Sequence, residues 1–201
     1  MNGTAGKPYK TRDGGVMRLS DLINTVTETS LARLEGSAFV NEEDRTDYAQ
    51  KLGMAAVKFG DLINHRSKDY IFDLDKFLSA EGKTGIYLLY TVSRINSIMK
   101  KAGDSAAELN GIYTEAERDI MLKLIMTGSA FVYAMNEKAP NYICENAYQL
   151  AVSFSHFYHE NHIMDESDPA KKASWLALAK LVRQVIIKHL DILGIKTVEN
   201  M

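Results

Sequence analysis

The stretch YICENAYQLAVSFSHFYHE, residues 142–160, carries the clearest structural signal in this chain. Its apolar residues recur every three or four positions, as expected for one face of an α-helix: Ile143, Ala147, Leu150, Ala151, Phe154, Phe157 and Tyr158. Such a stripe stabilises a helix mainly by packing against other helices. The stretch therefore predicts a helical bundle, with Cys144, the single cysteine, as a small core residue.

Helical patterns continue on both sides of this stretch. Only 3 prolines interrupt the 201 residues, so long helices are permitted almost everywhere. We expect helices from Arg18, over 44–63, over 74–79 and over 86–101, and a last one from Asp168-Pro169 to Gly194. A capping box, Thr114 with Glu117, opens another helix, with these residues inside: Ile120, Met121, Leu124, Ile125, Phe131 and Val132. The predicted fold class is all-α, with at least five helices.

Composition limits the function classes. No apolar run is long enough to cross a membrane, and the first residues resemble no signal peptide. A lone cysteine fits a reducing compartment, so we expect a soluble cytoplasmic protein. The net charge is −2, with 24 basic and 26 acidic residues, which is unlike a protein that binds nucleic acid through bulk basicity. Any RNA binding must use local basic residues and stacking.

Four dispersed stretches resemble arginyl-tRNA synthetases, in the order of that family: GKPYKTRDGGVMRLSDLI (6–23), FGDLINHRSKDYIFDLDKFL (59–78), GKTGIYLLYTVSRINSIMKKA (82–102) and LGIKTVENM (193–201). The resemblance implies the C-terminal part of such an enzyme. Residues 1–72 would be the end of the catalytic domain, with a signature loop at 6–18 and two helices. Residues 73–201 would be a helical anticodon-binding domain of the DALR type.

Lys7, Lys10 and Arg12 match the family's G-K-P-[FY]-K-T-R loop. The resemblance implies that these cations stabilise the charge that develops when ATP loses pyrophosphate. The alternative is a disordered basic tail. No H-x-G-H pattern and no Rossmann-type stretch accompany the loop. We therefore expect that the chain starts at an internal Met1, near the end of the catalytic domain, and neither holds ATP nor aminoacylates alone.

Tyr87, Tyr90 and Arg94 match the family pattern G-x-T-G-P-Y-L-Q-Y-x-x-x-R. They fall at i, i+3 and i+7, on one helical face. Unstacked RNA bases bind to aromatic rings and guanidinium planes, so the resemblance implies contacts with tRNA, against the alternative of core packing. Two positions depart from the pattern. Ile86 replaces proline, and Leu89 replaces a glutamine whose polar group could face RNA.

Three further residues are implied to contact the anticodon loop. Tyr158 aligns with a family aromatic, and His162 follows one turn later. Met201 ends the chain, as in the family's L-G-[ILV]-x-x-P-x-x-M, although Val198 replaces its proline. Core packing for Tyr158 and a frayed end for Met201 are the alternatives.

Three histidines, His156, His159 and His162, are spaced at intervals of three and suggest a metal site. Successive steps of three rotate around a helix, so the rings converge less well than an i, i+4 pair. No cysteine or carboxylate pattern completes the set. We therefore predict no metal.

The resemblance implies binding of arginine tRNAs through the anticodon loop. Arginine codons share G at the middle position, so their anticodons share C there. A site that recognises this C would therefore bind every isoacceptor. Two alternatives stay open: a free-standing tRNA-binding or regulatory paralogue, and a helical protein-interaction module without RNA. We expect no DNA or membrane partner. Apolar faces of residues 1–60, left without the catalytic core, predict fraying or self-association.

Overall fold

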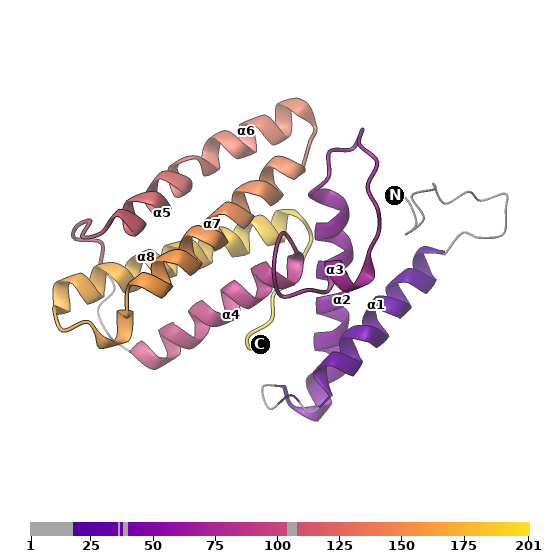
Figure 1. Cartoon of the computed structure of the whole chain (residues 1–201), viewed down its shortest axis with the longest axis horizontal. Helices are drawn as coiled ribbons and strands as arrows, with labels where there is room; N and C mark the ends of the chain where they lie inside the picture. Colours follow the sequence, from indigo (N-terminus) through magenta and orange to yellow (C-terminus); the bar gives the residue numbers. More distant parts are fainter. Residues whose placement is uncertain (1–17, 36, 38–39, 104–107) are drawn as a thin grey trace.

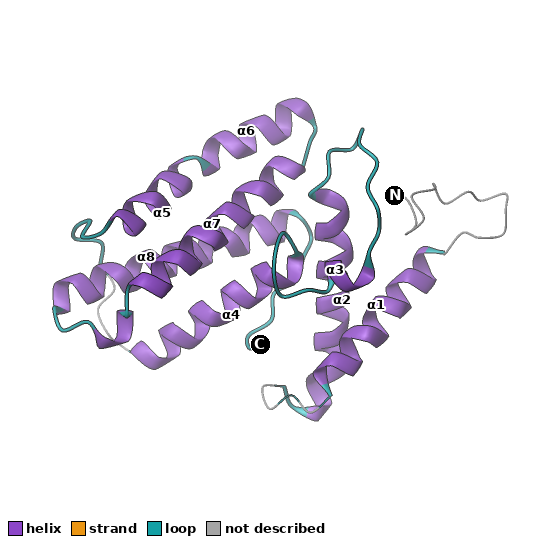
Figure 2. Ribbon diagram, viewed as in Figure 1, coloured by secondary structure: helices purple, strands orange, loops and turns teal. Residues whose placement is uncertain are grey.

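The computed structural model describes residues 18–35, 37, 40–103 and 108–201. Within these ranges the elements are helices and short 3-10 turns, without a β-strand, which confirms the all-α prediction (Figures 1 and 2). The principal helices are α1 (Leu19–Leu34), α2 (Arg45–Leu62), α3 (Leu74–Phe77), α4 (Gly85–Ala102), α5 (Glu115–Ile125), α6 (Thr127–Glu137), α7 (Asn141–Glu160) and α8 (Pro169–Ile192).

Helices α4, α7 and α8 form the centre of a bundle, and α5 and α6 cover one side of it (Figure 1). The stripe that decides the fold is buried, with Leu150, Phe154 and Phe157 at 1% exposure or less. Cys144 is also buried, as predicted. One core cluster joins these residues to the inner faces of α4 and α8.

Helices α1 and α2 pair with each other at the other end of the molecule (Figure 1). Glycine allows close approach to neighbouring helices on two sides of α2. At Gly53 an added Cβ would lie 3.0 Å from the Val26 side chain, and at Gly85 it would lie 2.3 Å from the Ala55 carbonyl oxygen. Helix α2 therefore packs tightly against both α1 and α4. Its Phe59 belongs to the same core cluster as the bundle.

Side-chain caps set the starts of the main helices. The hydroxyl of Thr84 accepts from the Tyr87 N–H at 3.0 Å and begins α4. The carboxylate of Asp168 caps α8, with Pro169 in the first turn as predicted. These caps fix where α4 and α8 start.

The helix predicted from Thr114 differs from the observed structure. It is divided at Met126 into α5 and α6, where two weak helix formers, Thr127 and Gly128, follow. Ile125 and Val132, which we placed inside, are 75% and 56% exposed. The reason is that α5 and α6 form an outer layer whose main contacts are with α7, so only one narrow face is buried.

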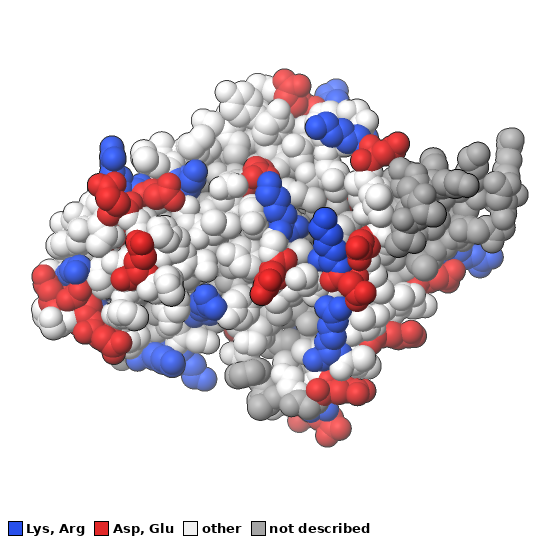
Figure 3. All heavy atoms as spheres, in the orientation of Figure 1, with Lys and Arg blue, Asp and Glu red and all other residues white. Residues whose placement is uncertain are grey.

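No helix among the described residues combines the length and the apolarity that a bilayer crossing requires. Figure 3 shows basic and acidic side chains interspersed over the visible face, without a continuous basic patch. On this face, contacts with a polyanion would therefore depend on individual groups rather than on a broad positive field.

Candidate nucleic-acid interface

Arg94, near the middle of α4, lies between two tyrosine rings. Its guanidinium carbon is 4.6 Å from the ring centre of Tyr90 and 5.6 Å from that of Tyr158. Its Nη2 also donates a hydrogen bond to the Tyr90 hydroxyl. All three side chains are half-buried. The cluster is thus a preorganised cationic and aromatic surface, of the kind on which bases stack.

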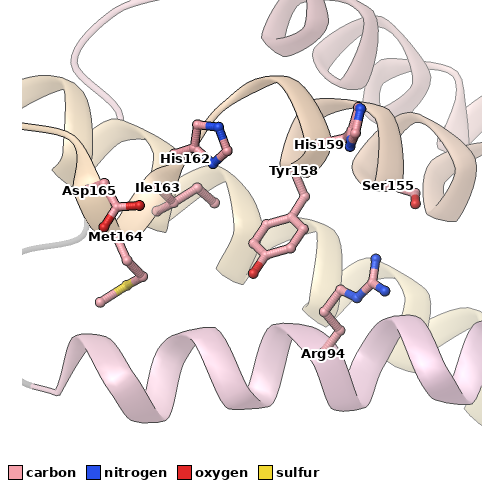
Figure 4. A pocket seen from close by; sticks show the side chains of 8 residues that line it. All are labelled: Arg94, Ser155, Tyr158, His159, His162, Ile163, Met164 and Asp165. Atoms are coloured by element: carbon pink, nitrogen blue, oxygen red, sulfur yellow. The ribbon is translucent and has the colours of Figure 1, made fainter.

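The ring of Tyr158 is oriented by its own helix. It stacks on Phe154, with ring centres 6.1 Å apart and planes 18° apart. Figure 4 shows Tyr158 reaching from α7 toward α4, with Arg94 rising beside it. Because Phe154 is buried, Tyr158 has one face against the core and its other parts at the surface. Core packing and surface contact are therefore compatible at this residue.

A hollow of about 590 Å³ adjoins this cluster. Its wall combines a cation, an aromatic ring, histidines and one carboxylate (Figure 4): Arg94, Ser155, Tyr158, His159, His162, Ile163, Met164 and Asp165. Helix α7 ends before Asn161, and the 3-10 turn Ile163–Asp165 returns along the same side. This combination of aromatic, cationic and polar side chains suits a planar, polar ligand such as a nucleobase.

Met164 and Asp165 were missed by sequence reasoning. They lie in the turn after α7, where the sequence has no helical period to indicate which side chains face Tyr158. The only local signal is Asn161, which ends α7 and whose amide donates to the Phe157 carbonyl at 2.9 Å. That contact indicates a helix end but not the direction that the chain then takes.

Tyr87 is turned toward α7 rather than toward Arg94. Its ring centre is 5.8 Å from that of Tyr148, and its hydroxyl donates to the Ala151 carbonyl at 3.5 Å. Burial raises the pKa of Tyr87. Leu89 is fully buried, so in this chain the position that carries glutamine in the family faces the core. Its replacement therefore leaves the surface of α4 unchanged, contrary to our expectation.

The chain after α8 folds back onto the bundle. Val198 is 3% exposed, although the family pattern has proline there. The Asn96 amide of α4 donates to the Glu199 carbonyl at 3.0 Å, and Met201 packs half-buried against the core. The end of the chain thus lies beside α4 (Figure 1).

Lys7, Lys10 and Arg12 lie outside the described residues. Among the described residues, no group of three or more histidine, cysteine, aspartate or glutamate side chains is placed to hold a metal. His156 instead lies 3.6 Å from Glu160, one helical turn away.

Two family descriptions match successive parts of the chain. The class I tRNA synthetase (R) catalytic domain matches residues 1–74, and the DALR anticodon binding domain matches residues 88–201, more than half of the chain. The chain is 40% identical to the arginine–tRNA ligase of Alkaliphilus oremlandii and 42% identical to that of Maricaulis maris. Each match covers 100% of this chain and 35% of the relative, so the chain spans about a third of their length.

Solved structures of arginyl-tRNA synthetases share the fold of this chain. The arginyl-tRNA synthetase of Thermus thermophilus superposes with a TM-score of 0.85 at 24% identity, over 94% of this chain and 33% of that one. That of Plasmodium falciparum superposes with a TM-score of 0.76 at 25% identity, over 92% and 34%. The chain belongs to the arginyl-tRNA synthetase family, of which it contains the end of the class I catalytic domain and the DALR anticodon binding domain.

Proposed function

We propose that the chain binds the anticodon loop of arginine tRNAs and reads the middle anticodon base. One observation carries the proposal: Arg94 lies against the rings of Tyr90 and Tyr158 beside an open hollow, within a DALR-type bundle. A single-stranded base inserted there would stack on a ring already fixed in place. His162 and Asp165 line the same hollow and would supply polar contacts to the base edge.

Aminoacylation itself, with ATP and arginine as substrates, we assign to the longer proteins that this chain matches over a third of their length. Lys7, Lys10 and Arg12 would serve that reaction, and residues 73–201 would serve tRNA binding. A cytoplasmic location also stays a prediction. The part of the function that this chain can test by itself is RNA recognition.

The test is a fluorescence-anisotropy titration with an arginine tRNA and with a copy altered only at the middle anticodon base. We expect saturable binding that weakens by about 1–3 kcal/mol on that change. Tyr158→Ala should remove a similar amount from binding of the unaltered tRNA, whereas Tyr158→Phe should retain it, because the ring remains. Equal binding to both tRNAs, abolished by moderate salt, would leave only nonspecific charge and end the proposal.

A matched control lies on the same helix. Tyr142, at the start of α7, is 38% exposed and packs against Tyr133 at a centroid distance of 5.8 Å, away from Arg94. Tyr142→Ala removes the same atoms without touching the proposed site. We expect it to bind tRNA like the unaltered chain, so a loss with this variant would mean that the tyrosines act through general stability.

A helical protein-interaction module is the second candidate function, and one observation favours it. Helix α6 has no charged residue before Glu137, and the outer layer exposes large apolar side chains: Leu122, Ile125, Met126, Val132, Tyr133 and Met135. In α1, Leu19 is also 65% exposed, which leaves open the self-association predicted for residues 1–60. Sedimentation at increasing concentration, with Ile125→Ser and Leu19→Ser, distinguishes these surfaces by which variant reduces association.

A further inference from the structure

A second hollow, of about 260 Å³, lies where α4, α8 and the chain end meet. The residues that line it are all polar or charged: Asn96, Ser97, Lys100, Arg183, Glu199 and Asn200. We propose that this hollow binds a backbone phosphodiester of the RNA whose base occupies the hollow beside Tyr158. The inference rests on the proposed function. It adds a second binding site, because recognition of the base beside Tyr158 does not itself involve this hollow.

Arg183 is held in place at one edge of its guanidinium. Its Nε donates to the Asn96 Oδ1, while the Asn96 Nδ2 donates to the Glu199 carbonyl. One amide therefore ties α4, α8 and the chain end together. Within the described part of the chain, Arg183 has no ion pair and no other hydrogen bond. Its Nη1 and Nη2 groups remain as a planar pair of donors, which suits two oxygens of a phosphate.

The lining side chains of the hollow carry more positive than negative charge. Arg183 and the exposed Lys100 supply two positive charges, and the Glu199 carboxylate supplies one negative charge. Among the side chains that line the hollow, positive charge therefore exceeds negative charge by one, which favours an anion. Neutral donors, the Ser97 hydroxyl and the Asn200 amide, complete the wall. Partial burial of Arg183 reduces the screening of its charge by salt.

The two hollows are neighbours around α4. Arg94 lines the hollow at Tyr158, and Ser97 lines the second hollow. Residues three apart lie about 5–6 Å from each other on a helix surface. An RNA strand whose base stacks on Tyr158 can therefore continue with its backbone across Ser97 to Arg183. In this arrangement the first hollow selects the base and the second holds the strand without regard to sequence.

Arg183→Gln tests this division of roles. Titrations with the arginine tRNA and its middle-base variant are run at several salt concentrations. We expect affinity for both RNAs to fall by the same factor, about tenfold at low salt. The negative slope of log K against log salt should become shallower by about 0.7, the value for one phosphate contact on a single strand. The preference between the two RNAs should not change.

Two variants separate charge from architecture. Lys188→Gln removes one exposed charge from another face of α8 and should leave the slope unchanged. Arg183→Lys keeps the charge and should keep the slope, although the planar fork is lost. If the salt dependence of affinity is as shallow for Arg183→Lys as for Arg183→Gln, the chain end has detached, and the inference is overturned.

The remaining outcomes are also decisive. If Arg183→Gln shows the slope and affinity of the unaltered chain, no phosphate binds there. If it loses the base preference with an unchanged slope, the residue acts on base reading and the inference is wrong. If the unaltered chain binds both RNAs equally and with a salt-dependent affinity, the proposed base recognition fails. The effect of Arg183→Gln on that salt dependence then still shows whether a phosphate binds in the second hollow. No binding at all overturns both.

Discussion

Replacing Gly85 by alanine would test the contact that joins α2 to the bundle. The added Cβ would lie 2.3 Å from the Ala55 carbonyl oxygen and 3.0 Å from the Phe59 Cβ. A backbone oxygen cannot rotate away, so the two helices must separate by roughly 1 Å to reach an ordinary contact distance. Overpacking of this kind costs about 1–3 kcal/mol. We expect a loss near the upper end, about 3 kcal/mol of unfolding free energy.

Gly128, in α6, gives the matched control. An alanine Cβ there would meet nothing within 4 Å. Because glycine is a poor helix former, Gly128→Ala should raise the unfolding free energy by about 0.5–1 kcal/mol. The same chemical change should therefore have opposite signs at the two positions.

Urea unfolding measures both effects through one reporter. Trp175 is the only tryptophan, and it is buried at 3% exposure, so its fluorescence follows unfolding of the core. A loss below about 0.5 kcal/mol for Gly85→Ala would refute the close approach, because the usual cost of overpacking is at least twice that. Stabilisation by both variants would refute it equally.

Burial raises the pKa of the Cys144 thiol to about 12, so thiol reagents at pH 8 should label the native chain slowly and the urea-unfolded chain at once. Burial lowers the pKa of His189, so the unfolded chain binds more protons below about pH 6.5, and stability should fall by at most about 2 kcal/mol between pH 7 and pH 5. Arg66 donates to the carbonyls of Glu137 and Lys138 at the end of α6, and Arg66→Ala should cost about 1 kcal/mol in urea unfolding.

Each of these expectations has a contrary result. Rapid labelling of the folded chain would place Cys144 at the surface. An unfolding free energy that stays constant from pH 7 to pH 5 would show that His189 is protonated equally in the folded and unfolded states. The same would follow if His189→Gln left the pH dependence of the unfolding free energy unchanged. Unchanged unfolding of Arg66→Ala would mean that water replaces its contacts without cost.

Periodicity predicted the helices well, because a buried face repeats locally along the chain. It did not distinguish a half-covered helix from a fully covered one. The stripe that contains Ile125 and Val132 has the period of a core helix, but the exposure of those residues depends on how many neighbours cover α5 and α6. Sequence spacing carries no information on that number.

The capping box shows the same limit at one residue. Thr114 accepts from the Glu117 N–H at 3.4 Å, as predicted. The Glu117 carboxylate, however, accepts from the Tyr113 N–H at 2.6 Å and from the indole of Trp175. The buried carboxylate is therefore hydrogen-bonded partly by a residue on α8. A local motif could not indicate this partner, because the contact joins residues 58 positions apart.

At the candidate site, spacing placed Tyr90 and Arg94 on one face of α4 but could not bring Tyr158 against them. That contact depends on how α4 and α7 cross, which the packing of the whole core determines. Resemblance to the family named these residues as a group. The three-dimensional arrangement adds what a motif lacks, namely a cation held between two rings beside a hollow.

The close packing at Gly85 affects how such enzymes can be divided in evolution or in the laboratory. The family boundary falls between residues 74 and 88, yet Leu52, Ala55 and Phe59 of α2 share their core with α4 and α7. A cut at that boundary would expose apolar surface on both products. The unit that can be exchanged between synthetases therefore begins before the DALR match, at α2. A graft without this helix would carry the proposed RNA-binding surface on an incomplete hydrophobic core.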